Sequence, residues 1–403
     1  MNQFEFSTSE KKLSKFVMLF HQDFERSDRL RHCHSYLSGL LLDGERKSIE
    51  PIAKRLSKCP QALQQFVNQS PWDYISVQKR LANHLAQSLK VNGGVLILDD
   101  TSLPKKGKHS VGVSPQYCGA LGKVANCQSI VSWHYASDKH FPINAELFLP
   151  KSWTKSKERM KRTFVPEERY EFVTKWQLSL KLLNQIDKAI FPYEAITFDA
   201  GYGEVREFLK ELDMRNEIFI GQIPKGHSFW PLDTPLNYNT DPKSTRARKY
   251  PEIADKTSKP ISASGWVKKL IKEGMKWQEV KTNVKSKPFV KIMRVRVKEA
   301  ISKAYYRPGR ERWLVIEELD KGRYKYWVSN APEETTLEKL VYWTSQRWKI
   351  EQGYQQLKEE LGLDHFEGRS WGGLHRHITL CFMAYGFLIL LGGKKNLYFA
   401  SDT

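Results

Sequence analysis

Two aspartates in the chain each follow a short apolar run that has the composition of a buried strand. Residues 95–98 precede Asp99 and Asp100, and residues 195–198 precede Asp199. Ligands of open α/β sheets collect at strand ends, so these carboxylates are candidates for one site. Because like charges repel, two carboxylates brought together need cations. Magnesium is suited to this role, since it binds a few carboxylates together with water and substrate phosphates.

A third carboxylate lies near the C-terminus, in a segment with helical spacing. Arg347, Glu351 and Lys358 are separated by four and seven residues, so they share one face of a helix. Glu351 would complete the metal site, and the two basic residues would contact flanking phosphates. The alternative is an ordinary Arg–Glu pair on a solvated helix, which this segment taken alone favours.

The elements around these carboxylates predict an α/β fold. Strands are expected at 95–98, 128–136, 143–149, 195–198 and 217–223. Helices are expected at 166–190 and from 201 to 212, which gives the order three strands, helix, strand, helix, strand. Residues 1–90 carry helix signals, including Ser70 as a helix cap followed by Pro71. They predict a small helical domain that either binds DNA or braces the rest.

Residues 224–333 interrupt this pattern with a basic, strand-rich segment. Strands are expected at 290–297, 312–317 and 324–329, and a helix resumes from 337 to 361, with Gly362 as its cap. Between positions 243 and 310 there are 20 basic and 5 acidic residues. The segment suits a nucleic-acid clamp, with a solvated β-domain as the alternative. Its aromatic residues are Trp266, Trp277, Tyr305 and Tyr306.

Overall composition agrees with a polyanionic partner and an intracellular setting. The net charge is +20, which favours phosphate binding through counterion release. The five cysteines form no C-x-x-C pair and are expected to be reduced thiols of a cytosolic protein. The longest apolar run, residues 378–391, is shorter than the roughly 20 residues of a membrane span, so it predicts a buried helix and no membrane partner.

These motifs together resemble those of the DDE transposases of bacterial insertion sequences. That family has the signature Y-x2-R-x3-E-x6-K, which Arg347, Glu351 and Lys358 match, while Thr344 stands at the tyrosine position. The segments 99–103 (DDTSL) and 199–203 (DAGYG) resemble the two aspartate motifs. Segments 105–128 and 368–377 (GRSWGGLHRH) resemble one subgroup, and the likeness extends over about residues 70 to 390.

The resemblance implies an RNase H-like core interrupted by the β-rich insertion. The domains expected are a helical one at 1–90, a first core part at 91–223, the insertion at 224–333 and C-terminal core helices at 334–403. Successive strand residues point to opposite faces. Alignment with the family motif selects Asp99 as the first catalytic carboxylate and leaves Asp100 as the alternate.

The function implied is cleavage at insertion-sequence ends and strand transfer into target DNA, by a two-metal reaction. Asp99, Asp199 and Glu351 would be the catalytic residues and the ligands of Mg²⁺, for which Mn²⁺ could substitute. The DNA contacts expected are Arg347, Lys358, Lys105, Lys106, Lys268, Lys269, Arg294 and Arg296. The active form would be a homodimer on double-stranded DNA in the bacterial cytoplasm, associated with the nucleoid. The alternatives are an RNase H-like nuclease that does not join DNA and a non-catalytic DNA-binding relative.

Overall fold

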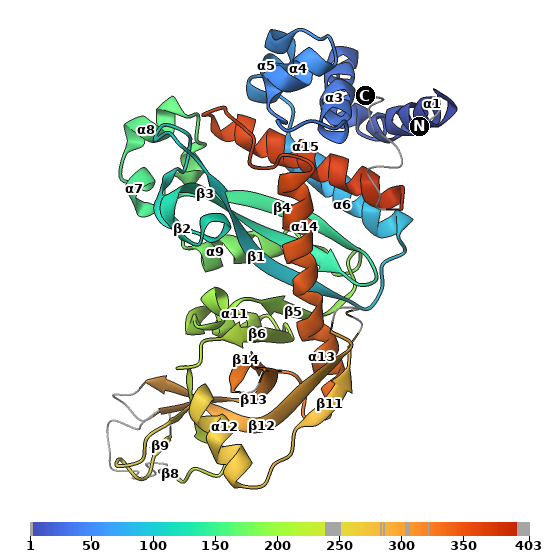
Figure 1. Ribbon diagram of the computed structural model, residues 1–403. Coiled ribbons are helices and arrows are strands. Elements are labelled where there is room, and N and C mark those ends of the chain that lie inside the picture. The colour runs from blue at the N-terminus through green and yellow to red at the C-terminus, as the bar shows by residue number, and fades with distance from the viewer. Residues whose placement is uncertain are drawn as a thin grey trace. The chain divides into compact units, whose positions relative to one another are not determined.

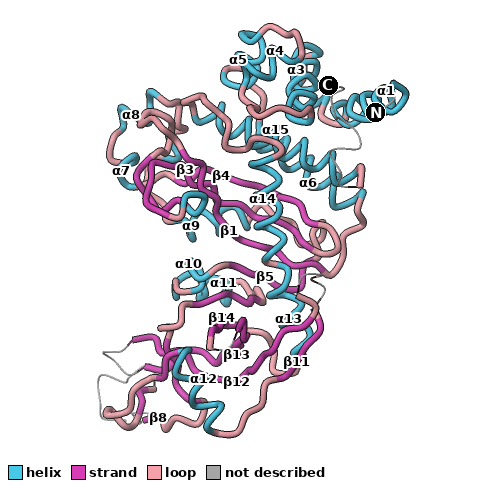
Figure 2. The backbone as a smooth tube through the Cα atoms, viewed as in Figure 1, coloured by secondary structure: helices cyan, strands magenta, loops and turns pink. Residues whose placement is uncertain are grey.

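The computed structural model describes residues 3–237, 251–282, 284, 287–302, 307–320 and 322–392. The chain contains both helices and strands, and the fold class is α/β, as the sequence predicts (Figures 1 and 2). The chain divides into two compact units. Unit 1 comprises residues 1–193 and 348–403, and unit 2 comprises residues 194–347. These units cut the chain at other positions than the predicted domains, whose boundaries stay a prediction.

The described residues before position 89 form only helices, which belong to unit 1. They are α1 (Gln3–Met18), α2 (His21–Phe24), α3 (Ser27–Leu41), α4 (Ile49–Arg55), α5 (Pro60–Asn68) and α6 (Tyr74–Ser88). The predicted cap at Ser70 is wrong, because α6 begins after Asp73. The carboxylate of Asp73 accepts hydrogen bonds from the amides of Ile75 and Ser76. An aspartate at this position satisfies amide groups that have no partner in the first turn.

The strands of unit 1 are antiparallel and centre on β3 (Lys123–Ala136). One edge of β3 pairs with β1 (Gly94–Pro104), and the other edge pairs with β2 (Ser114–Cys118) and β4 (His140–Phe148). The expectation that the first strand ends at Asp99 is wrong. Residues 100–104 continue the ladder because they pair with residues 127–131, so Asp99 and Asp100 lie within β1.

The segment after β4 contains short helices in place of the single long helix expected at 166–190. They are α7 (Lys151–Thr154), α8 (Lys157–Arg162), η2 (Glu167–Arg169) and α9 (Lys175–Leu183), and η1 (Gly119–Leu121) lies earlier, after β2. The start of α9 is set by a capping box, in which Thr174 and Gln177 bond to each other's main-chain amides. Phe172, which the helical spacing included, lies before this cap and packs edge-on against Phe148.

Two C-terminal helices complete unit 1, namely α14 (Trp348–Glu359) and α15 (Trp371–Leu390). Gly362 adopts the left-handed conformation (φ 66°) expected after a helix end. By length and composition α15 could cross a membrane, but 83% of its most apolar window is buried inside the protein. It packs against α6, α3 and α5 (Figure 1). Such burial is that of a core helix, as predicted from residues 378–391.

Unit 2 is built on one continuous set of strands. β5 (Tyr193–Phe198) pairs in parallel with β6 (Phe219–Ile223), and β6 pairs with β14 (Arg323–Ser329). The order then continues through β13 (Arg307–Asp320), β12 (Phe289–Ser302), β7 (Ser228–Pro231) and β10 (Ile261–Ser262). The remaining elements are β8 (Leu236–Asn237), β9 (Glu252–Ile253), β11 (Gln278–Lys281), α10 (Ala200–Gly203), α11 (Arg206–Met214), α12 (Ala263–Lys272) and α13 (Leu337–Gln346).

Of the four aromatic residues of the basic segment, the structure describes two, one of them buried and one half-buried. Trp266 is 2% exposed and belongs to the core of unit 2, as expected if the segment is a solvated β-domain whose aromatic residues form its core. Trp277 stacks on Tyr324 with ring centroids 5.7 Å apart. Tyr305 and Tyr306 lie outside the described residues. The clamp hypothesis therefore depends on the charges of this segment more than on its rings.

Candidate active site

The two adjacent aspartates of β1 lie on opposite faces of the unit 1 sheet and meet different groups. The carboxylate of Asp100 accepts a hydrogen bond from the Ser129 hydroxyl at 2.9 Å. It also forms an ion pair with the Nζ of Lys175, the first residue of α9, at 2.6 Å. Lys175 was not foreseen from the sequence, because its partner is 75 residues away. Asp100 thus has an internal cation of its own.

Asp99 faces α14, on the other side of the sheet. Its cross-strand neighbour in β3 is Ser132, whose hydroxyl lies 2.6 Å from the hydroxyl of Tyr354 in α14. Lys358, one turn further along α14, donates to the carbonyl of Ser102 in β1 at 3.1 Å. Burial raises the pKa of Tyr354, and the nearby charge of Asp99 raises it further. Helix α14 therefore lies over the β1–β3 face that carries Asp99.

Glu351 is positioned by this same contact. It lies three residues before Tyr354 and seven before Lys358, so all three share one side of α14. The side chain of Glu351 is exposed and that of Asp99 is half-buried. Unit 1 thus brings the face of Asp99 and the side of α14 that carries Glu351 together, while the role of these residues in catalysis stays a prediction.

A series of buried hydrogen bonds links β3, β4 and α15 on the side of the sheet that α14 covers. The Ser132 hydroxyl lies 2.8 Å from Nε2 of His134, whose Nδ1 lies 3.0 Å from Nε2 of His140. Nδ1 of His140 in turn lies 3.1 Å from the hydroxyl of Tyr385 in α15. Burial lowers the pKa of both histidines, that of His140 to about 3, so both rings are neutral.

The close approach of α14 to these hydrogen-bonded residues requires a glycine. A Cβ at Gly353 would lie 2.3 Å from Cε1 of His140. Only a residue without a side chain lets the helix approach the histidine at this distance. A small residue between Glu351 and Tyr354 was a signal in the sequence, but nothing local identified what it contacts.

In unit 2, Asp199 follows β5 and caps α10. Its Oδ1 accepts from the amide of Tyr202 at 3.2 Å. The short helix approaches β6 so closely that a Cβ at Gly203 would lie 1.9 Å from the carbonyl oxygen of Gln222. The second glycine of the Asp199 motif is therefore explained by packing, because Gly203 lets the turn that carries the carboxylate rest on the sheet.

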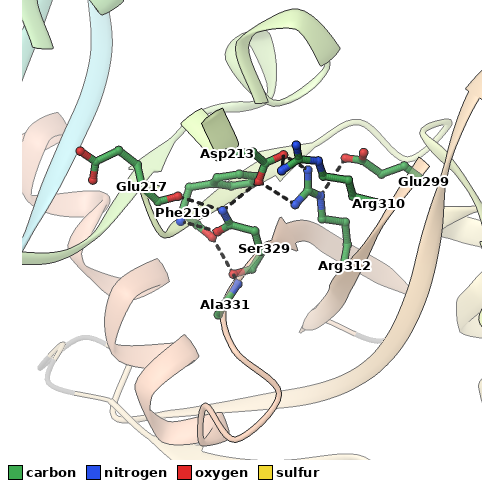
Figure 3. Close-up of polar contacts among 9 residues, drawn as sticks. Asp213, Glu217, Phe219, Glu299, Arg310, Arg312, Ser329 and Ala331 are labelled. Carbon is green, nitrogen blue, oxygen red and sulfur yellow. Dashed lines mark hydrogen bonds and ion pairs between the residues drawn. The ribbon is translucent and has the colours of Figure 1, made fainter. Parts of the chain in front are cut away.

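A buried ion pair fastens α11, the next helix, to the same sheet (Figure 3). Arg312 of β13 donates from Nη1 and Nη2 to Oδ1 and Oδ2 of Asp213, at 2.9 and 2.5 Å. Its Nε donates to Glu299 at 3.0 Å. Asn330 links Asp213 (3.0 Å) to the amide of Phe219 in β6 (2.8 Å). This network holds α11 on β6, beside the strand that leads to Asp199.

The predicted triad is divided between the two units. Asp99 and Glu351 belong to unit 1, whereas Asp199 and Arg347 belong to unit 2. All three carboxylates offer oxygen ligands, and this donor chemistry fits magnesium or manganese. Among the residues that the structure describes, no three His, Cys, Asp or Glu side chains are grouped so that they could hold a metal.

Two of the lysines expected to contact DNA are used inside unit 1. The Nζ of Lys105 donates to the carbonyls of Asp364 (3.4 Å) and Phe366 (2.5 Å), and burial lowers its pKa to about 8. Burial also lowers the pKa of Lys358, which is bonded to Ser102. Lys106, in contrast, is exposed. The ammonium groups of Lys105 and Lys358 therefore brace main-chain carbonyls in the unbound protein.

The expected DNA contacts in unit 2 lie on three elements. Arg347 is half-buried at the end of α13. In α12, Lys268 is exposed, and Lys269 is paired with Glu273 one turn away. In β12, Arg294 and Arg296 both stack on the Trp313 ring, at 4.4 and 5.2 Å from its centroid. Lys268 is thus the most accessible of these cations.

Comparison with known proteins gives two matches. The family model described as DDE superfamily endonuclease matches residues 19–288, which include Asp99 and Asp199 and end before Glu351. A protein of Microchaete diplosiphon, the "Probable transposase for insertion sequence element IS701", is 27% identical over 192 residues. The aligned part is 47% of this chain and 47% of that protein, so the chain aligns with about half the length of this relative.

Proposed function

Because the chain belongs to the DDE superfamily of endonucleases, we propose that it is an insertion-sequence transposase. It would cleave DNA at the ends of the element and join the freed ends to target DNA. The observation that carries this proposal is the family match over residues 19–288, which holds both aspartate motifs in order. The likeness to a transposase of an insertion sequence supports it.

Within this proposal, Asp99, Asp199 and Glu351 are the catalytic carboxylates and the magnesium ligands. Bound magnesium would activate the attacking hydroxyl and stabilise the leaving oxygen in phosphoryl transfer. Asp99 is proposed over Asp100 because alignment with the family motif selects it, and because Asp100 lies on the other face of the sheet, against Lys175 of α9. The side of α14 that carries Glu351 lies toward the sheet face of Asp99, held there through Tyr354.

The test uses the full-length protein with a plasmid that carries the element and its flanking DNA. With magnesium, the wild type should release the element and join it to a second plasmid. Asp99→Asn, Asp199→Asn and Glu351→Gln should each lower cleavage at least about 100-fold while DNA binding is kept. Asp100→Asn is the matched control and should still cleave. A dead Asp100→Asn beside an active Asp99→Asn would reverse the assignment.

The same assay separates the alternative functions. A nuclease without transferase activity would release DNA ends but would not join them, and a non-catalytic relative would bind DNA and do neither. Excess chelator should abolish cleavage, and added Mg²⁺ or Mn²⁺ should restore it. Full activity in chelator would refute metal dependence. We expect the active complex to be a homodimer on DNA, which light scattering of the protein with and without end DNA would measure.

The basic segment of unit 2 is proposed to hold DNA through its backbone. Each phosphate neutralised should contribute about −0.9 to the log–log slope of affinity against salt. Lys268→Gln with Lys269→Gln should flatten that slope and weaken binding to any duplex, because phosphate contacts carry no sequence information. Arg294→Gln with Arg296→Gln tests the β12 pair in the same way. Unchanged slopes would mean that these cations form a solvated surface.

A further inference from the structure

Unit 1 contains a second feature with the chemistry of nucleic-acid binding, apart from the carboxylates. A cavity of 810 Å³ is lined by residues of α5, of the loop after α8 and of the start of α15. Its lining includes Arg162, Arg369 and Arg376 and no aspartate or glutamate. We call it the arginine pocket. A cavity lined by three guanidinium groups and no carboxylate attracts anions.

The three arginines are placed differently. Arg376 is half-buried, and its guanidinium donates to the carbonyls of Val67, Asn68 and Trp72 at 3.2–3.3 Å. These three hydrogen bonds are to neutral carbonyls and hold the charge of Arg376 in the pocket wall. Arg162 and Arg369 are exposed. The pocket therefore has one fixed positive charge and two that can adjust to a ligand.

The ring of Phe164 lies at the same pocket, where it is exposed to solvent and carried by a strained backbone. Phe164 lines the cavity and is 77% exposed, which is the largest exposed fraction among the large hydrophobic residues described. Its φ of 56° is in the left-handed region, where a residue with a side chain is strained. Glycine usually occupies this position after a helix, here after α8. An exposed ring on a strained backbone is a frequent mark of a functional site.

The loop that carries Phe164 is joined to the start of α15. The amide of Trp371 donates to the carbonyl of Thr163 at 2.8 Å, and the amide of Val165 donates to that of Met160 at 3.0 Å. The segment 368–377, which resembles one insertion-sequence subgroup, therefore forms one wall of the pocket. Helix α5 contributes the amide side chains of Gln64 and Asn68 to the lining, and the Oδ1 of Asn68 accepts a hydrogen bond from the Ser370 hydroxyl at 3.3 Å. Amide groups of this kind can bond to base edges.

A second cavity of unit 1 has a different set of charged side chains in its lining. The cavity between α6 and β4 has a volume of 590 Å³ and is lined by Glu146 and Asp187 as well as Lys79. Burial raises the pKa of Glu146 to about 7. That cavity has acidic as well as basic side chains in its lining, whereas the lining of the arginine pocket has only cationic and neutral groups.

We propose that the arginine pocket binds an unpaired nucleotide of a DNA strand. Arg162 and Arg369 bond to its phosphates, and Phe164 stacks on its base. Basic grooves combined with an aromatic platform are the means by which proteins hold single strands without reading their sequence. This inference rests on the proposed function in one respect, which is that the strand is DNA.

The ring is tested with Phe164→Gly, measured by fluorescence anisotropy with a labelled oligothymidine and a blunt duplex. Glycine accepts the left-handed backbone, so the variant should keep or raise the melting temperature. Affinity for oligothymidine should fall about 5- to 150-fold, because one stacked base is lost. Affinity for the blunt duplex should not change, since it offers no unpaired base.

The arginines are tested by the salt dependence of oligothymidine binding. Arg162→Gln with Arg369→Gln should reduce the log–log slope by about 1.4, the value for two phosphates of a single strand. Phe164→Gly should leave the slope as in the wild type. Arg31→Gln, an exposed arginine of α3, is the control for loss of one charge elsewhere in unit 1 and should leave binding unchanged.

Several results would overturn the proposal. They are wild-type affinity of Phe164→Gly for oligothymidine, equal losses on both probes, an unchanged slope in the arginine variant, and displacement of oligothymidine by micromolar free ATP. The last would indicate a mononucleotide site. A wild-type protein that cleaves and joins DNA while these variants bind normally would refute only the pocket. A wild-type protein that binds neither probe would refute the proposed function as well.

Discussion

Replacing Arg312 with methionine should destabilise unit 2 by about 3 to 5 kcal/mol, the usual result of breaking a buried ion pair. The side chains of Arg312 and Asp213 are each 3% exposed, and two hydrogen bonds of 2.9 and 2.5 Å join them. Without Arg312 the carboxylate keeps Asn330 at 3.0 Å and the exposed Arg310 at 3.4 Å. These remaining partners place the expected loss near the lower end of the range.

The loss is measured by urea denaturation at pH 7, with hydrogen exchange of peptides from α11 and β6 as the local readout. Arg310→Met is the matched control. Its side chain is 56% exposed, so it should cost less than about 1 kcal/mol. Arg312→Met combined with Asp213→Leu should recover part of the loss, because the buried Asp213 carboxylate is removed and only Glu299, whose side chain is 14% exposed, has then lost its arginine. The rate of hydrogen exchange should rise in α11 and β6 of Arg312→Met. The rate of DNA cleavage by this variant should fall.

Equal stabilities of Arg312→Met and Arg310→Met would refute this reasoning. A double variant that is less stable than Arg312→Met would also contradict it. In either case the network in Figure 3 would not be what holds α11 against the sheet.

Three further changes probe the face of Asp99. Acid should destabilise unit 1, because His134 and His140 have lowered pKa values (about 3 for His140) and take up protons mainly when unfolded. The contribution of the two neutral histidines to the free energy of unfolding is present above pH 6.5, and the free energy of unfolding should be lower by about 1.4 kcal/mol per histidine at pH 5.5. Equal urea midpoints at pH 7.5 and 5.5 would contradict this. Gly353→Ala should displace α14 and sharply reduce cleavage, because the added Cβ would lie 2.3 Å from Cε1 of His140. Gln352→Ala, which changes an exposed neighbour, should cleave normally, and similar cleavage rates of the two variants would refute the packing argument. Tyr354→Phe removes the hydroxyl bonded to β3, and thermal unfolding should show a loss of about 1 kcal/mol, with no change arguing against a bond there.

Some features of this protein could be read from local patterns. An apolar run predicted a strand where β5 lies, and a strand was also predicted where β12 lies; both strands are confirmed. Three motifs in order predicted the family, which the match over residues 19–288 confirms. These features depend only on neighbouring residues, because strand periodicity, helix spacing and motif order are properties of short segments.

Other features were decided by partners distant in sequence. The first strand continues past Asp99 because residues 100–104 pair with β3, and the residues near Asp99 do not predict this pairing. Helix α9 is short because Thr174 caps it, although the apolar spacing continues on both sides. Local periodicity indicates which face is apolar but not where pairing or capping ends an element.

The chemistry of individual charges also depended on the tertiary structure. Asp99 and Asp100 are equivalent acids in the sequence, and only the folding of α9 and α14 onto opposite faces gives one a lysine and the other a tyrosine and a glutamate-bearing helix. The sequence predicts Lys105 as a phosphate contact, whereas in the folded protein its Nζ donates to two main-chain carbonyls. The sequence by itself determined which residue types were present and how they were spaced. The tertiary structure decided which charges have internal partners, because the partners of a buried charge come from segments that meet only when the chain is folded.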